Sequence, residues 1–156
     1  MKTSIGLFDS LTSDHIAVNI KANSWEEAVD SAGLIMVNKG LTRPSYTEAM
    51  KETLKTLGPY YVIAPGIAMP HARPEDGVIQ TGFSLITLDN PVEFGSEAND
   101  PVDIVIGFAA LNKENHITAL QEIAACFSDN NFINNVRAAS TKQDILKILA
   151  SKRKGL

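Results

Sequence analysis

The sequence predicts an α/β domain of three layers, in which a central mixed β-sheet lies between helices. Stretches with a helical apolar period alternate along the chain with short apolar runs typical of strands. The run Val102–Ala110 is apolar apart from Asp103, as expected of a strand covered on both faces. The run Ile79–Leu88 has neighbours within reach of short turns, while other connections are long enough to cross by helices, so the sheet should be mixed. A length of 156 residues is typical of one domain, expected to span residues 1–156.

The chain is expected to open with a strand and a long helix. A short helix at Ile5–Leu11 should precede the first strand, Ile16–Ile20. His15, just before that strand, is typical of a solvated loop histidine, and we assign it no role. Ser24 is a good N-cap for the first long helix, and Gly40 is a good residue to end it.

A second helix should follow and deliver the chain to its most unusual stretch. It should begin near Ser45, because Glu48 lies three residues later at the capping-box spacing, and it should end at Gly58. Two short apolar runs come next, Tyr60–Ala64 and Ile67–Met69, and both are typical of strands.

The second half should add two longer strands, a short edge strand and three helices. After Ile79–Leu88 we expect a turn with a short edge strand at Asn90–Gly95, and then the buried strand Val102–Ala110. Helices are expected at 113–128, 131–139 and 141–152. The inward face of the first of these should hold Ile117, Leu120, Ile123, Ala124 and Phe127. Cys126 on the same helix should be a small buried residue rather than a reactive thiol.

Composition and charge exclude several classes of protein. The net charge of −4 argues against a nucleic-acid binder, which would carry a basic face. No apolar run approaches the roughly 20 residues that a membrane span needs. The first ten residues resemble no signal peptide, and one cysteine fits a reducing compartment, so we expect a cytoplasmic protein.

The segment Gly58–Gly77 presents one histidine on a rigid backbone. It holds four of the seven prolines and three of the ten glycines. Pro70 removes a backbone donor and holds the preceding residue extended, so His71 should emerge at a strand end, between Pro70 and Pro74. Arg73 supplies a permanent cation two residues further on.

Few chemistries suit this histidine. Metal binding needs several ligands close together, and no second His, Cys or acidic cluster lies nearby in sequence. The chain has no G-x-S-x-G nucleophile elbow. His71 therefore has the features of a nucleophile or a general base. The alternative is a tight turn that carries an incidental surface histidine.

The residues Ala64-Pro65-Gly66-Ile67-Ala68-Met69-Pro70-His71-Ala72 resemble the phosphohistidine signature of mannitol/fructose-type IIA components. These are components of the bacterial phosphoenolpyruvate-dependent sugar phosphotransferase system (PTS). The longer string from Gly58 to Gly77 is most similar to the ascorbate-specific branch, and the resemblance extends to Asn115-His116-Ile117. It implies a mixed sheet between helices and no bound metal or organic cofactor. It also implies that His71 accepts a phosphoryl group from the carrier protein HPr and passes it to a cysteine of the IIB component, which serves the membrane transporter IIC.

The resemblance also implies a role for a second histidine, and it does not identify the residue that replaces an arginine of the mannitol-type branch. The family pairs its phosphorylated histidine with another, which implies that His116 donates to His71 or to its phosphate. The mannitol-type branch carries an arginine near the end of the second helix, whereas this chain has Thr53 there, between Lys51 and Lys55. Arg73 is our candidate to supply the missing charge. Of the apolar residues near the motif, Ile67 and Met69 are equally compatible with a docking surface and with the core.

Two other functions are compatible with the sequence. A regulatory relative of the nitrogen branch takes phosphate on the same histidine but controls other proteins. A non-catalytic binding module would use His71 only as a structural turn residue.

Overall fold

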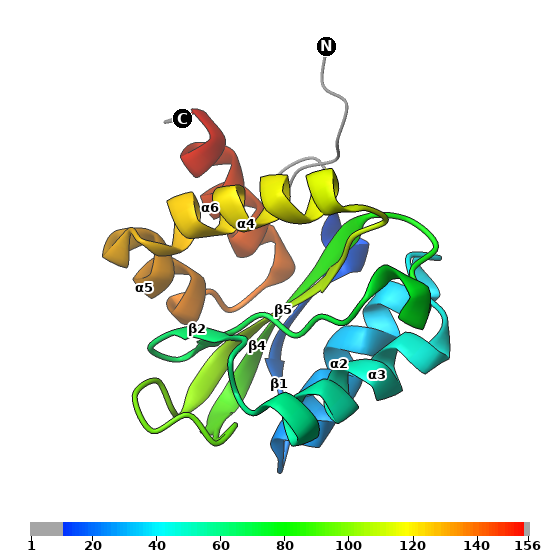
Figure 1. The fold of residues 1–156 in the computed structure, drawn as a ribbon. Helices are drawn as coiled ribbons and strands as arrows, with labels where there is room; N and C mark the ends of the chain where they lie inside the picture. Colours follow the sequence, from blue (N-terminus) through cyan, green and yellow to red (C-terminus); the bar gives the residue numbers. More distant parts are fainter. Residues whose placement is uncertain (1–10, 155–156) are drawn as a thin grey trace.

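A five-stranded mixed sheet separates two layers of helices (Figure 1). The computed structural model describes residues 11–154. The strand order is β1-β4-β5-β3-β2. The β1/β4 and β3/β5 pairs are parallel, whereas β4/β5 and β2/β3 are antiparallel, so the prediction of a mixed sheet is confirmed. The strands are β1 (Ile16–Ile20), β2 (Val62–Ala64), β3 (Ile67–Ala68), β4 (Gly82–Val92) and β5 (Val102–Ala109).

The predicted three-layer architecture is also confirmed. One layer consists of α2 (Trp25–Asn38) and α3 (Pro44–Leu57) (Figure 1). The other layer consists of α4 (Lys113–Phe127), α5 (Asn130–Ala138) and α6 (Lys142–Lys154). Each layer closes its own apolar core against one face of the sheet. Within residues 11–154, no helix combines the length and the apolar character needed to cross a membrane.

The first elements follow the predictions closely, except at His15. Strand β1 has the predicted bounds, Ser24 Oγ caps α2 by accepting from the Glu27 N–H, and Gly40 follows the helix with a φ of +73°. The expected helix Ile5–Leu11 lies outside the described residues but for Leu11. His15 is buried rather than solvated, and its Nδ1 lies 2.8 Å from the Thr12 hydroxyl at the end of a 3-10 turn.

Helix α3 begins in a different way from the prediction. Its N-cap is Arg43 and Pro44 is its first residue, so the capping box predicted at Ser45 is wrong. Proline suits this position, because its φ is already helical and its missing N–H needs no partner. The Ser45 hydroxyl donates to the Asp76 carbonyl instead, across to the segment after His71.

The strands around the motif and before β5 differ in length from the predictions. Strands β2 and β3 leave Tyr60, Tyr61 and Met69 outside. Strand β4 continues to Val92, which pairs with Val102, so no separate edge strand follows it. Its register with β5 is irregular between Thr87 and Val92, the stretch that contains Pro91. Proline is tolerated there because an irregular stretch does not require a backbone N–H donor from every residue.

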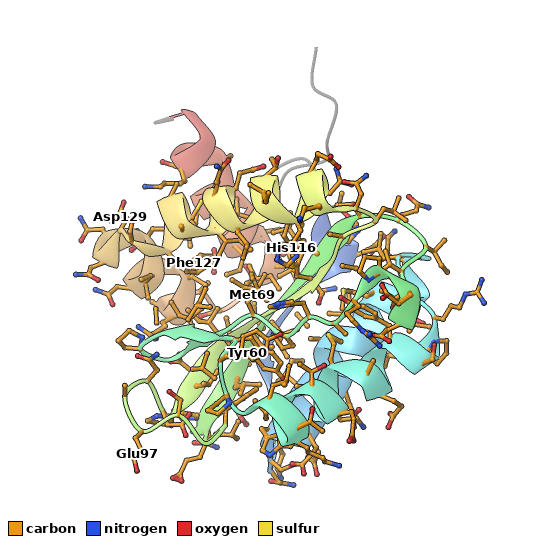
Figure 2. All side chains as sticks on the ribbon, viewed as in Figure 1. Tyr60, Met69, Glu97, His116, Phe127 and Asp129 are labelled. Atoms are coloured by element: carbon orange, nitrogen blue, oxygen red, sulfur yellow. The ribbon has the colours of Figure 1, made fainter. Side chains whose placement is uncertain are left out.

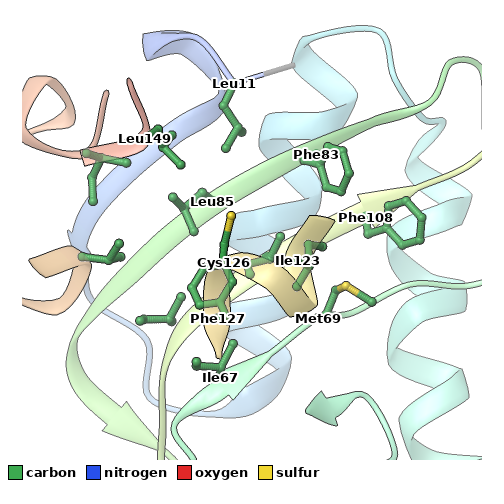
Figure 3. Packing of buried hydrophobic residues seen from close by; sticks show 14 of the residues in the cluster. Leu11, Ile67, Met69, Phe83, Leu85, Phe108, Ile123, Cys126, Phe127 and Leu149 are labelled. Carbon is green, nitrogen blue, oxygen red and sulfur yellow. The ribbon is translucent and has the colours of Figure 1, made fainter. Parts of the chain in front are cut away.

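Helix α4 buries a narrower face than the sequence indicates. Ala119, Ile123, Cys126 and Phe127 face the core. The prediction is wrong for Ile117, Leu120 and Ala124, which are exposed. Ile67 and Met69 are fully buried, so the alternative that they belong to the core is the right one. Figure 3 shows both of them in the same apolar cluster as Cys126 and Phe127.

Candidate functional site

The backbone of β5 guides the chain up to His71. Strand β3 runs parallel to β5, and the pairing continues past its end, where the Phe108 N–H donates to the Pro70 carbonyl at 3.1 Å. On the other side, the Met69 N–H donates to the Tyr61 carbonyl at 2.8 Å. Backbone hydrogen bonding thus continues through Pro70, beyond the end of β3, and His71 follows directly after it.

The turn after His71 is hydrogen-bonded to the buried hydroxyl of Tyr46. Tyr46 of α3 is fully buried. Its Oη donates to the Phe108 carbonyl at 2.7 Å and accepts from the Ala72 N–H at 2.9 Å. Burial raises the pKa of Tyr46, so the hydroxyl keeps the proton that it donates. One side chain thus links α3, β5 and the loop that carries His71.

One hydrogen bond fixes the tautomer of His71. Its Nδ1 lies 2.8 Å from the Met69 carbonyl oxygen. A carbonyl can only accept, so Nδ1 carries the proton and Nε2 holds the free lone pair. Burial of the ring, with a smaller contribution from His116, lowers the pKa of His71, although the Met69 bond opposes the shift. The ring is therefore neutral at pH 7, with a nucleophilic nitrogen turned away from the sheet.

His116 lies beside His71, in the first turn of α4. Asn112 caps this helix by accepting from the Asn115 N–H at 2.9 Å, and Asn115 in turn accepts from the Thr81 hydroxyl of the segment before β4. The centroids of the two imidazole rings are 5.4 Å apart. Phe108 packs against both rings, with centroid distances of 5.9 Å to His71 and 5.3 Å to His116. Figure 2 shows His116 projecting from α4 toward the segment that contains Met69.

A pocket of about 730 Å³ opens in front of these two rings. It lies between the end of α3, the loop after His71 and the start of α4. Its lining residues are Ala49, Glu52, Thr53, Thr56, Leu57, Tyr60, His71, Ala72, Arg73, Pro74, Asp76 and His116. Across residues 11–154, no three His, Cys, Asp or Glu side chains are grouped so that they could hold a metal ion.

The structure brings Arg73 to this pocket, but with carboxylate partners. Its guanidinium lies 3.3 Å from Asp76 and 3.8 Å from Glu75, and the side chain is 73% exposed. Hydrogen bonding to Arg73 lowers the pKa of Asp76, so the carboxylate is ionised at pH 7. The charge of Arg73 is thus partly neutralised within its own turn.

Lys51 and Lys55, which lie on either side of Thr53 in the sequence, do not line the pocket. Lys51 pairs with Asp30 of α2 at 2.7 Å and with Glu48 at 3.0 Å, and Lys55 is exposed. Thr53 lines the pocket, where its hydroxyl donates to the Ala49 carbonyl of its own helix.

Sequence reasoning missed three aromatic residues at the site. Tyr60 lies with its Oη 3.4 Å from His71 Nε2, whereas its place in the sequence indicates only the start of a strand. Tyr46 is 26 residues from Ala72 and Phe108 lies in an ordinary strand pattern, so no local signal identifies either of them.

The chain is similar to characterised proteins over nearly its whole length. Residues 9–152 match the sequence model of the family "Phosphoenolpyruvate-dependent sugar phosphotransferase system, EIIA 2". The ascorbate-specific PTS system EIIA component of Salmonella typhimurium is 42% identical over 145 residues, which are 92% of this chain and 94% of that protein. In structure, the mannitol-specific cryptic phosphotransferase enzyme IIA CmtB from Escherichia coli aligns with a TM-score of 0.83 at 33% identity, covering 92% of this chain and 97% of the other. The complex of enzyme IIAMTL and phosphorylated enzyme IIBMTL from Escherichia coli gives a TM-score of 0.80 at 32% identity, with 90% and 97% covered.

Proposed function

Since the chain belongs to the family of EIIA 2 components of the phosphoenolpyruvate-dependent sugar phosphotransferase system, we propose that it carries a phosphoryl group on Nε2 of His71. The observation that carries the proposal is the fixed tautomer: His71 Nδ1 donates its proton to the Met69 carbonyl, which leaves Nε2 unprotonated in a pocket that His116 also lines. A neutral nitrogen with a free lone pair is what attack on phosphorus requires.

The phosphoryl donor in this proposal is the phosphohistidine of HPr. The Nε2 lone pair of His71 forms the new bond to phosphorus, while the bond from phosphorus to the donor nitrogen breaks and leaves its electron pair there. No proton has to move in this step. The ring of His71 becomes positively charged, and the Met69 carbonyl, which accepts from Nδ1, stabilises that charge. Catalysis then rests on positioning and on charge stabilisation.

We assign His116 and Arg73 to the phosphoryl oxygens. The ring of His116 is adjacent to that of His71, so it can donate to a group attached at Nε2. Arg73 lines the same pocket, and reaching a phosphoryl oxygen would require it to loosen its contacts with Asp76. We therefore expect His116 to matter more than Arg73.

The second half of the proposed cycle passes the phosphoryl group to a cysteine of a IIB component, which serves the membrane transporter IIC. Exposed apolar side chains support protein docking at the pocket: Leu57 and Tyr60 line it, and Ile117 comes directly after the lining residue His116. Apolar residues gathered at one place on a surface mark interaction sites. The similar complex of enzyme IIAMTL with phosphorylated enzyme IIBMTL supports the same class of partner.

The proposed transported substrate is L-ascorbate, with the protein acting in the cytoplasm. The relative from Salmonella typhimurium is named as ascorbate-specific, and the similarity covers 92% of this chain. This assignment rests on that similarity alone.

Phosphorylation of the purified protein tests the carrier proposal. With phosphoenolpyruvate, enzyme I and HPr, intact mass should show one added phosphoryl group, labile in acid and stable in base. The chain has three histidines, and His71→Ala should abolish the modification while His15→Gln keeps it. No modification of the wild-type protein, or full modification of His71→Ala, would refute the proposal.

Transport then tests the substrate and the regulatory alternative. Deletion of the gene should abolish uptake of labelled ascorbate, and the His71→Ala gene should not restore it. Phosphorylation of His71 without loss of ascorbate uptake in the deletion strain would favour another sugar or a regulatory role.

A further inference from the structure

Tyr60 places a hydroxyl at the nucleophilic nitrogen. Within residues 11–154, it is the only side chain that hydrogen-bonds the His71 ring, with Oη 3.4 Å from Nε2. The rings meet edge to face, with centroids 5.6 Å apart and an interplanar angle of 81°. Tyr60 follows a turn at Gly58, whose φ is +87°, so the chain reverses after α3 and brings the tyrosine over the pocket.

The contact is long, and the hydroxyl can exchange it for a better partner. A bond of 3.4 Å lies beyond the usual range for a hydroxyl donor. A phosphoryl group bonded to Nε2 would extend three charged oxygens outward from that nitrogen, into the space that Tyr60 borders. Bonds to charged acceptors are shorter and about twice as strong as neutral ones. The hydroxyl therefore gains by moving from Nε2 to a phosphoryl oxygen.

The site also needs such a donor, because Arg73 is the only arginine or lysine among the described residues that lines the pocket, and it already has carboxylate partners. Its guanidinium contacts both Asp76 and Glu75. Neutral donors at the pocket must then carry much of the charge stabilisation. Burial raises the pKa of Tyr60, so its hydroxyl keeps its proton at pH 7.

We propose that Tyr60 is a catalytic residue of phosphoryl transfer, whose hydroxyl donates to a phosphoryl oxygen as the bond between Nε2 and phosphorus forms. This rests on the proposed function of His71. The phenolic proton stays on oxygen throughout and only its acceptor changes, from Nε2 before transfer to a phosphoryl oxygen during it. The lone pair of Nε2 is thereby freed for attack by the same movement that stabilises the incoming group.

A neighbouring tyrosine provides a matched control. The Tyr61 ring also contacts His71, with centroids 6.0 Å apart, but its hydroxyl donates away from the pocket to the Met50 carbonyl at 3.2 Å. Tyr60→Phe and Tyr61→Phe thus remove the same atom from adjacent rings, and only the first removes a hydroxyl from the nitrogen. Tyr60 is 53% exposed, so Tyr60→Phe should fold normally.

The experiment measures the rate of transfer from phospho-HPr to each variant by rapid quench. Tyr60→Phe should lower the maximal rate about 10- to 100-fold with little change in the HPr concentration at half-saturation, since the docking ring remains. Tyr61→Phe should transfer within about twofold of the wild-type rate. The ³¹P resonance of the phosphohistidine should shift in Tyr60→Phe and not in Tyr61→Phe, which a purely structural role of Tyr60 would not produce.

The outcomes separate this proposal from the one that it rests on. Normal wild-type phosphorylation together with an unimpaired Tyr60→Phe overturns the role of Tyr60 alone. Equal slowing of Tyr60→Phe and Tyr61→Phe also overturns it, because the effect would then come from disturbed packing around His71. A wild-type protein that takes no phosphate on His71 overturns both.

Discussion

At the scale of single residues, His71 is neutral because of how its ring is enclosed. Burial is the largest cause of its lowered pKa, and His116 adds to it. His15, in the 3-10 turn just before β1, has a lowered pKa for the same main reason, with Lys39 as the second cause. Two of the three histidines therefore favour the uncharged form in the folded protein.

This has a consequence for stability against pH. Both histidines have folded-state pKa values below the ordinary 6.5. Below pH 6.5 the unfolded chain binds more protons than the folded chain, so the free energy of unfolding should fall as the pH drops from 6.5 through the folded-state pKa values. Chemical denaturation at about pH 7.5 and about pH 5 measures the loss.

Single variants identify the groups responsible. His15→Gln and His71→Gln should each reduce the difference in unfolding free energy between the two pH values. Carboxylates such as Asp76 have pKa values below the ordinary 3.8, so their protonation affects stability mainly at lower pH. If the double variant were as sensitive as the wild type, the histidines would not be the cause.

His116 should affect the rate of transfer rather than the ability to accept phosphate. His116→Ala should still be phosphorylated, but about 10- to 100-fold more slowly, which corresponds to about 1.4–2.7 kcal/mol of lost transition-state stabilisation. The measurement is the rate of transfer from phospho-HPr, beside a thermal melt of the same variant. Wild-type rates in both directions would show His116 to be a surface residue, and a loss as complete as that of His71→Ala would make the two histidines one obligatory unit.

At the scale of elements, the β2–β3 hairpin is clamped by α5. Arg137 donates through Nε to both carboxylate oxygens of Asp103 at 2.9 Å, and through Nη2 to the Pro65 carbonyl at 2.9 Å. Gly66 forms the turn with a φ of +78°, directly under the Arg137 guanidinium. The clamp holds the strand from which His71 emerges.

Two glycine variants distinguish the cost of backbone strain in this turn from the cost of losing the Arg137 contact. Gly40 and Gly66 have nearly equal φ values of +73° and +78°, but a Cβ at Gly40 meets nothing within 4 Å, while one at Gly66 meets Arg137 Nη2. Gly40→Ala should lower the free energy of unfolding by about 1–2 kcal/mol. Gly66→Ala should cost about 1–3 kcal/mol more, because it displaces a charged hydrogen bond. Urea titration measures both, and equal costs would mean that the Arg137 clamp contributes nothing.

At the scale of the whole molecule, the pocket forms where the two helical layers meet the end of the sheet. α3 belongs to one layer and α4 to the other, and the segment after β3 runs between them. Each layer is anchored by its own core, so the distance between His71 and His116 depends on both cores being intact.

Cys126 reports on the core beneath α4. It is fully buried, and burial raises its pKa to about 11, so it is neither accessible nor ionised in the folded protein. Its reaction with a thiol reagent at pH 7.5 should be slow and should become fast in denaturant. Exposure to the reagent under native conditions should not lower the rate of phosphoryl transfer. Rapid native labelling with loss of transfer would contradict a structural role.

The elements with strong local signals, and the candidate nucleophile, can be predicted from the sequence alone. The bounds of β1, the Ser24 cap and the turn at Gly40 follow from side-chain period and backbone preference, which act within a few residues. His71 is conspicuous for the same reason, since Pro70 and Pro74 limit its backbone wherever it lies in the fold.

The rest of the site around His71 depends on contacts between residues that are distant in the sequence. Tyr46 reaches Ala72 and Phe108 across the fold, Ile117 is exposed despite its helical period, and the charge of Arg73 is shared with Asp76. These outcomes depend on which groups from distant parts of the chain arrive at the same place, and on which of them are left facing water. Local period and propensity carry no information about that, because burial and long-range hydrogen bonds are properties of the packed layers.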